Sequence, residues 1–178
     1  LGKAVHTNHL IYTGPWMRDN GPTPLEVMRG PSVPLFAGPA GYHPADIRAA
    51  YGVPSTGGSG AIAIVDAFNF ASALNDFNVF ATQFGLPVET STNATTSTNT
   101  VFQVVYQGTT KPKNDGGWRQ EAALDIEWAH SMAPNANIYL VETNSASLAD
   151  TFATVLKAAS LPGVTQVSMS FGASEFSS

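Results

Sequence analysis

Two acidic residues, Glu121 and Asp125, stand four positions apart in a stretch with helical spacing, so their side chains share one helix face. The residues around them are mostly apolar, which predicts that this face is at least partly buried. Two carboxyl groups held together away from water resist ionising side by side, and they share a proton. Such a pair can act as a general base at an acidic pH at which a histidine is already protonated. The spacing alone is equally compatible with an acidic helix face in solvent.

Polar residues also stand where three predicted strands end. Asp66 and Glu142 each follow a short run of apolar residues, and a third run leads into the sequence SMSFG at 168–172. In parallel α/β sheets, ligands bind beyond the carboxyl ends of the strands. We therefore expect a site at this edge of the sheet, although a single acid at a strand end can also serve as a helix cap or a turn residue.

The elements that would position these residues alternate along the chain. Apolar residues at helical spacing predict helices, and unbroken apolar runs predict strands that are buried on both faces. Each connection is long enough for a right-handed βαβ unit. The predicted fold class is therefore α/β, with a parallel, doubly wound sheet. We expect helices over 44–51, 72–84, 118–132 and 148–160, and strands over 61–65, 100–106, 137–141 and 164–170.

Composition excludes several other kinds of site. The 178 residues include no cysteine, which removes disulfide frameworks, thiolate zinc sites and cysteine nucleophiles. A net charge of −5 with only 12% charged residues disfavours a nucleic-acid partner. No apolar run reaches the roughly 20 residues that a membrane helix needs, so no membrane partner is expected. The histidines form no metal-ligand pattern, so we expect no metal site in this chain, and we expect His130 to be a capping or surface residue.

The first part of the chain differs in amino-acid composition from the rest. Residues 1–41 are rich in proline and glycine, which predicts an extended arm or linker with at most one helical turn near 24–29. A disordered leader is the alternative interpretation. Residues 42–178 hold all the predicted strands and are expected to form the folded domain.

Four segments after residue 40 together carry a resemblance to one known family. They are GYHPADIRAAY at 41–51, the strand and helix within 61–87, Gly117-Trp118 with Glu121 and Asp125 before APNA at 133–136, and VSMSFG at 167–172. In this order they resemble the sedolisins, or serine-carboxyl peptidases. The segments are similar to the start of the mature catalytic domain, its first core strand and helix, its Glu-x-x-x-Asp catalytic helix and its substrate-binding strand. The resemblance covers about residues 41–178.

The resemblance implies a subtilisin-like fold and endopeptidase activity at acid pH on protein or peptide substrates. By position, Glu121 would be the general base toward a serine hydroxyl, since a serine needs a neighbouring base to become a nucleophile. Asp125 would orient Glu121 and share its proton. Asp66 matches a further acidic position that extends this network in some members of the family.

The resemblance also implies which residues bind the substrate. Ser170 and Gly172 match the backbone that pairs with an extended substrate as an added strand. Phe171 stands where many members have tryptophan or another aromatic residue, so it would form a pocket wall of altered shape.

The sequence departs from the family pattern in one large respect. The nucleophilic serine of the family, in a Gly-Thr-Ser context, has no match here, because Ser177 and Ser178 lack that context. The aspartate that donates to the oxyanion and a C-terminal calcium site have no match either. We therefore expect the N-terminal part of a secreted peptidase, with a second chain or segment that carries the serine and the calcium site. Residues 1–41 would be the propeptide tail and linker of a precursor.

Two other functions remain open at this point. The missing serine would suit a non-catalytic, peptidase-derived protein that binds peptides or assembles with other subunits. The alternation of strands and helices would also allow a flavodoxin-like cofactor module, but the sequence has no phosphate-binding glycine loop.

Overall fold

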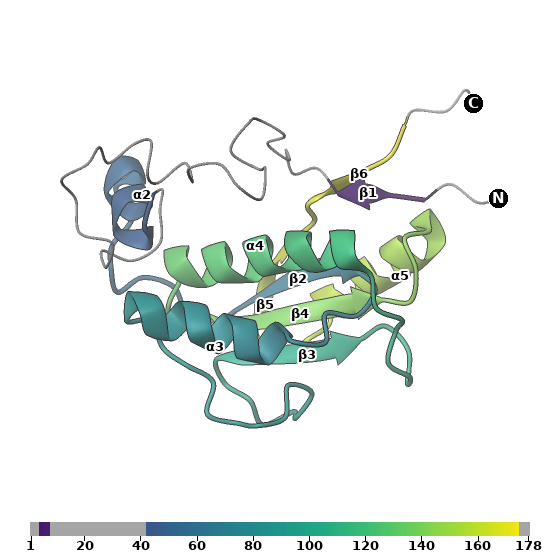
Figure 1. Ribbon diagram of the computed structural model, residues 1–178, viewed down its shortest axis with the longest axis horizontal. Helices are drawn as coiled ribbons and strands as arrows, with labels where there is room; N and C mark the ends of the chain where they lie inside the picture. The colour runs from purple at the N-terminus through teal and green to yellow at the C-terminus, as the bar shows by residue number, and fades with distance from the viewer. Residues whose placement is uncertain (1–3, 8–41, 175–178) are drawn as a thin grey trace, which may run out of the picture.

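The computed structural model describes residues 4–7 and 42–174 (Figure 1). Two short strands, His6–Thr7 (β1) and Phe171–Gly172 (β6), stand apart from a regular alternation of longer elements. The predicted helices and strands within 42–170 are all present, with ends displaced by at most two residues. The helices are Pro44–Tyr51 (α2), Ala73–Phe84 (α3), Gly116–Met132 (α4) and Leu148–Ala159 (α5), and the longer strands are Ala61–Ala67 (β2), Phe102–Tyr106 (β3), Asn137–Thr143 (β4) and Val164–Ser168 (β5).

The four longer strands form one parallel sheet in the order β3-β4-β2-β5. α3 and α4 pack on one face of this sheet and α5 packs on the other (Figure 1). The two central strands, β2 and β4, are buried along nearly their whole length, which explains why their sequences are unbroken apolar runs. The structure thus confirms the prediction of an α/β class with a parallel sheet between helices.

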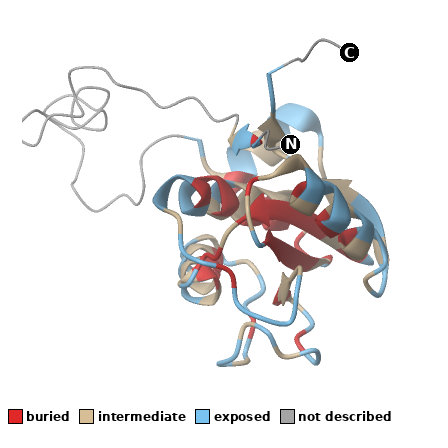
Figure 2. Ribbon diagram, turned by 90° about the vertical axis from the view of Figure 1, so that its right-hand side faces the viewer, coloured by how far each residue is buried: buried red, intermediate tan, exposed pale blue. Residues whose placement is uncertain are grey.

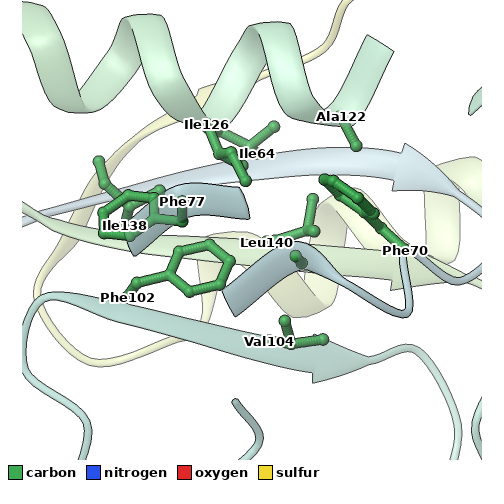
Figure 3. Close-up of a cluster of buried hydrophobic side chains, with 10 residues drawn as sticks. Ile64, Phe70, Phe77, Phe102, Val104, Ala122, Ile126, Ile138 and Leu140 are labelled. Carbon is green, nitrogen blue, oxygen red and sulfur yellow. The ribbon is translucent and has the colours of Figure 1, made fainter. Parts of the chain in front are cut away.

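The larger part of the core lies between the sheet and the helices α3 and α4 (Figure 3). Ile64 of β2 and Leu140 of β4 are fully buried there, because every second side chain of a strand points to the same face. Phe77 of α3 stacks on Phe102 of β3 with ring centroids 4.5 Å apart. Burial of each such side chain contributes about 1.5–3 kcal/mol to folding. Ala122 and Ile126 of α4 belong to this core, so the core fixes the position of α4 on the sheet.

Smaller side chains line the opposite face of the sheet, where α5 packs. Ala61, Ala63 and Val65 of β2 meet Ala158 of α5, and these small residues let the helix approach the strand closely. Figure 2 shows the result, with buried residues gathered in the central strands and exposed residues on the outer sides of the helices.

Helix α4 begins two residues before the predicted start. Asp115 caps it, because its side chain accepts hydrogen bonds from the backbone N–H groups of Gly117 and Trp118 at 3.0 and 3.1 Å. An aspartate at this position typically contributes about 1 kcal/mol to helix stability. The cap fixes the first turn of α4 and hence the place of Glu121 in the second.

The sequence-based expectation for His130 is wrong. This residue is fully buried between α4 and α3, where its ring lies 4.6 Å from that of Phe77. Its Nε2 atom lies 2.8 Å from the carbonyl oxygen of Pro87, so Nε2 carries the proton and donates. Burial lowers the pKa of His130, although the Pro87 carbonyl opposes that shift. Because histidine is a polar residue, its position in the sequence did not indicate that this side of the helix faces the core.

The predicted strand over 164–170 is too long, because β5 ends at Ser168. The chain leaves β2 at that point, and Phe171–Gly172 pairs instead with His6–Thr7 in an antiparallel arrangement. Residues 4–7 of the predicted arm therefore lie on the folded body. The rest of the arm, including the helical turn expected near 24–29, lies outside the described residues.

Candidate functional site

Two acidic side chains lie next to each other at the carboxyl end of the sheet. Asp66 of β2 and Glu142 of β4 are paired in the register of these neighbouring parallel strands. Both are almost completely buried, with 1% and 0% of their surfaces exposed. They follow Ile64 and Leu140 by two residues, so they lie on the face of the sheet that α3 and α4 cover.

Helix α4 brings the two predicted catalytic carboxyl groups to the same place. Glu121 is buried, with 2% of its surface exposed, and Asp125 is half-buried. α4 packs directly against β2, and the charges of both residues act on Asp66. The structure thus brings together Glu121, Asp125 and Asp66, all predicted from the sequence, and adds Glu142 to them. These four residues are called the carboxyl cluster below.

The surroundings favour the protonated forms of Asp66 and Glu142. Burial raises the pKa of Asp66 well above its ordinary value of 3.8, and the negative charges of Asp125, Glu121 and Glu142 raise it further. No hydrogen-bond partner faces either Asp66 oxygen among residues 4–7 and 42–174. Burial also raises the pKa of Glu142, to about 7. A proton is therefore held inside the cluster at a pH at which an exposed carboxyl group would have lost it.

Glu142 is fixed by the loop that follows β2. The backbone N–H of Phe70 donates to its Oε1 atom at 2.8 Å, and the amide of Asn69, turned so that its nitrogen faces the carboxyl group, donates to Oε2 at 3.2 Å. The loop itself begins with Phe68 in the left-handed region, at φ 67°. Such a conformation costs a residue with a side chain about 1–2 kcal/mol. It is held here by a hydrogen bond from the Phe68 N–H to the carbonyl oxygen of Thr143 at 2.9 Å.

The predicted substrate-binding residues lie at the end of the sheet, where a peptide strand is already present. Phe171 pairs with Thr7 and Gly172 pairs with His6, and half-buried Ser170 directly precedes this strand. On its other side, residues 4–5 pair with the segment after β4. Ala4 forms an antiparallel bridge with Ser147, and the Val5 N–H donates to the carbonyl oxygen of Ala146. Residues 4–7 thus lie as an extended strand between 146–147 and 171–172, and the place that they fill is called the groove below.

The groove borders two of the elements that carry the carboxyl cluster. Val5 packs in a small buried group with Ala67 and Trp118. Ala67 follows Asp66 in β2, and Trp118 lies three residues before Glu121, on the same side of α4. Residues 4–7 therefore lie at the end of β2 and the first turns of α4, the two elements that carry Asp66 and Glu121.

Sequence reasoning missed two parts of this arrangement. The sequence shows Glu142 as an acid at a strand end, but the predicted catalytic residues do not include it. Its spacing of two from Leu140, which matches that of Asp66 from Ile64, is the signal that would have placed both on one face. The place of residues 4–7 could not be read from the sequence, because no local pattern links them to residues near 171.

The described residues hold no group of three or more histidine, aspartate or glutamate side chains arranged to bind a metal ion. In the same part of the chain, no helix combines the length and the apolar character needed to cross a membrane.

Known proteins give no independent guide to this site. Comparison of the chain with protein families, with curated proteins and with solved structures finds no match. The resemblance to the sedolisins therefore rests on the sequence motifs alone, and the site has to be interpreted from its own chemistry.

Proposed function

We propose that this chain is part of an acid-acting serine-carboxyl endopeptidase with a subtilisin-like fold, and that it supplies the acid–base machinery and the substrate-binding strand. The observation that carries the proposal is the carboxyl cluster at the carboxyl edge of the sheet, beside a groove that accepts an extended peptide. The strand order β3-β4-β2-β5, with helices on both faces, is compatible with the proposed fold.

In the proposed mechanism, Glu121 accepts the proton of a serine hydroxyl as that oxygen attacks the peptide carbonyl. Asp125, one helical turn away, orients Glu121 and shares its proton. Asp66 remains protonated because it is buried among other carboxyl groups, so it can donate a hydrogen bond toward Asp125 or Glu121. Glu121 then returns the proton to the departing amine. Carboxyl groups suit this role near pH 4, where histidine is protonated and cannot act as a base.

The groove supports the choice of a peptide substrate. Addition of a strand to a free sheet edge is a common way for a protein to bind an extended peptide, because the backbone supplies the hydrogen bonds. Residues 4–7 bind Phe171 and Gly172 in this manner. We interpret them as a segment of a propeptide that occupies the substrate groove of a secreted precursor.

The nucleophile must come from outside this chain, since the sequence has no Gly-Thr-Ser motif. We propose that a second chain or segment carries it, along with the calcium site that the resemblance implies. Strand β5 supports this proposal. It pairs with β2 on one side, pairs with no strand on its other side among the described residues, and has Thr165 and Gln166 exposed. A further strand would cover this edge.

The test compares two variants of the same helix. Glu121→Gln should lower the hydrolysis of a denatured protein at pH 4 by about a hundredfold or more, because it removes the general base. Glu127→Gln is the matched control, since Glu127 also lies half-buried on α4 but outside the carboxyl cluster. Equal activity of the two variants would refute the assignment of Glu121. Intact mass spectrometry of the native material should show a second polypeptide with a Gly-Thr-Ser sequence.

A non-catalytic peptide-binding or assembly protein is the second candidate. The groove that holds residues 4–7 favours it as well, because strand addition requires no catalysis. Under this function the native protein would hydrolyse no substrate at pH 4 but would still bind extended peptides.

A further inference from the structure

Val5 is the one member of the bound strand that is buried. Only 4% of its surface is exposed, whereas its neighbours Ala4 and His6 are exposed. Its side chain packs among apolar residues of β2, α4 and the segment after β4, and these surroundings are called the pocket below. Val5 forms one buried cluster with three other residues, Ala67, Trp118 and Ala146. Three partly buried residues pack against this cluster: Phe68, Leu148 and Phe171.

Backbone contacts on both sides of the strand determine which residue enters the pocket. The pairing of Thr7 with Phe171 and of His6 with Gly172 sets the register on one side. The hydrogen bond from the Val5 N–H to the Ala146 carbonyl oxygen sets it on the other side. A shift by one residue would turn His6 inward and Val5 outward, because successive side chains of a strand point in opposite directions.

The walls of the pocket define what it accepts. None of the six side chains around Val5 carries a charge, so a charged residue in this position would lose its hydration without gaining a partner. A flat aromatic wall from Trp118 and the small side chains of Ala67 and Ala146 leave room for an aliphatic side chain of the size of valine.

We propose that this is the specificity pocket of the groove, and that its ligands are extended peptides with a β-branched or similar-sized aliphatic side chain in the place of Val5. This inference rests on the proposed function only where it calls the bound peptide a substrate. Residues 4–7 are then an occupant within the same chain, which an external peptide of the same pattern has to displace. The pocket is distinct from the carboxyl cluster, so it selects the peptide without taking part in the reaction.

The first experiment measures the selectivity of the pocket on the full chain. The variant Val5→Asp should release the internal strand and open the groove. Three dye-labelled decapeptides with the sequence of residues 1–10 are then titrated by fluorescence anisotropy: one unchanged, one with Asp in place of Val5, and one with Asp in place of His6. The unchanged peptide and the His6→Asp peptide should bind similarly. The Val5→Asp peptide should bind at least about tenfold more weakly, as expected for one aliphatic side chain of this size.

The same titration on the unsubstituted chain provides a second reading that does not depend on how well the Val5→Asp variant folds. The internal strand lowers the affinity for all three peptides by the same factor, so their ratio is preserved. Equal binding of the unchanged and Val5→Asp peptides, or an equal loss for the His6→Asp peptide, would overturn the inference.

A change in the pocket wall tests the same idea from the other side. Ala146→Leu should fill part of the pocket and shift the preference from a peptide with Val at position 5 to one with Ala there. An unchanged preference would count against the pocket. These are binding measurements, so they are kept separate from an assay of hydrolysis at pH 4 on native material that includes the chain or segment with the serine. Selective binding together with no hydrolysis by that material would refute the proposed peptidase and leave the pocket intact. Hydrolysis without this selectivity would overturn the pocket and leave the proposed peptidase intact.

Discussion

Replacing Glu142 with glutamine should remove a large part of the pH dependence of stability between pH 4.5 and 7. Burial raises the pKa of this residue from the ordinary 4.5 to about 7, although the N–H of Phe70 and the charge of Lys111 oppose the shift. The folded chain therefore keeps a proton that the unfolded chain loses above pH 4.5. The contribution to stability is complete below pH 4.5 and is lost as the pH rises to 7. The loss amounts to about 3 kcal/mol, at about 1.4 kcal/mol for each pH unit.

Glutamine keeps the size of the side chain and an oxygen that can accept from the Phe70 N–H, but it has no proton to lose. The variant should match the unsubstituted chain at pH 4 and should be more stable at pH 8 by up to about 3 kcal/mol. Asp66 beside it also has a raised pKa, so a smaller slope of the same sign should persist. The Tyr106 hydroxyl also interacts with Glu142, and burial and the Glu142 charge raise the pKa of Tyr106, so this hydroxyl stays neutral below pH 8.

The assay is urea unfolding followed by far-ultraviolet circular dichroism at unit steps from pH 4 to 8. Glu127→Gln is a useful control, because burial and Asp76 raise the pKa of Glu127 to about 7 as well. Glu127 is partly exposed, so its effect should be smaller than that of Glu142. A free energy of unfolding that falls equally in the Glu142→Gln variant and in the unsubstituted chain would refute the reasoning.

Two further predictions concern the core between α3, α4 and the sheet. Phe77→Ala should lower the free energy of unfolding by about 3–5 kcal/mol, whereas Val79→Ala on the exposed side of the same helix should change it by less than about 0.5 kcal/mol; similar urea midpoints would contradict the packing in Figure 3. Burial lowers the pKa of His130, so the unfolded chain takes up a proton first and the contribution of His130 to stability should fall as the pH drops below about 6.5, opposite in sign to that of Glu142. The free energy of unfolding of His130→Gln, measured relative to that of the unsubstituted chain, should therefore rise as the pH falls from 7 to 4 in urea titrations, and a difference that stays constant with pH would contradict the prediction.

Much of the fold could be predicted because the local sequence patterns agree with the elements that the whole fold requires. The unbroken run at 61–65 identified β2 as a central strand, and Gly85 after Phe84 marked the end of α3, where it adopts the left-handed conformation at φ 66°. The spacing of Glu121 and Asp125 correctly placed them on one side of α4. The apolar residues around them predicted that they are at least partly buried, and the structure shows Glu121 buried and Asp125 half-buried.

The parts that could not be predicted depend on contacts between distant segments. The pairing of Asp66 with Glu142 follows from the alignment of two strands, and no pattern near either residue specifies that alignment. The burial of His130 arises from the way α3 packs across α4. Equally, nothing near Val5 reveals that its partner is a carbonyl group at Ala146.

The strand formed by His6–Thr7 has a consequence for the order of folding. Its partners in β6 lie about 160 residues further along the chain, so the pairing closes a very long loop, and the entropy lost in such a closure grows with loop length. The parallel sheet, by contrast, forms through much shorter crossovers. We expect the sheet to assemble first and the strand to attach last. By the same reasoning, hydrogen exchange should find the amides of 5–7 to be among the first to open, while those of β2 and β4 stay protected until the whole domain unfolds.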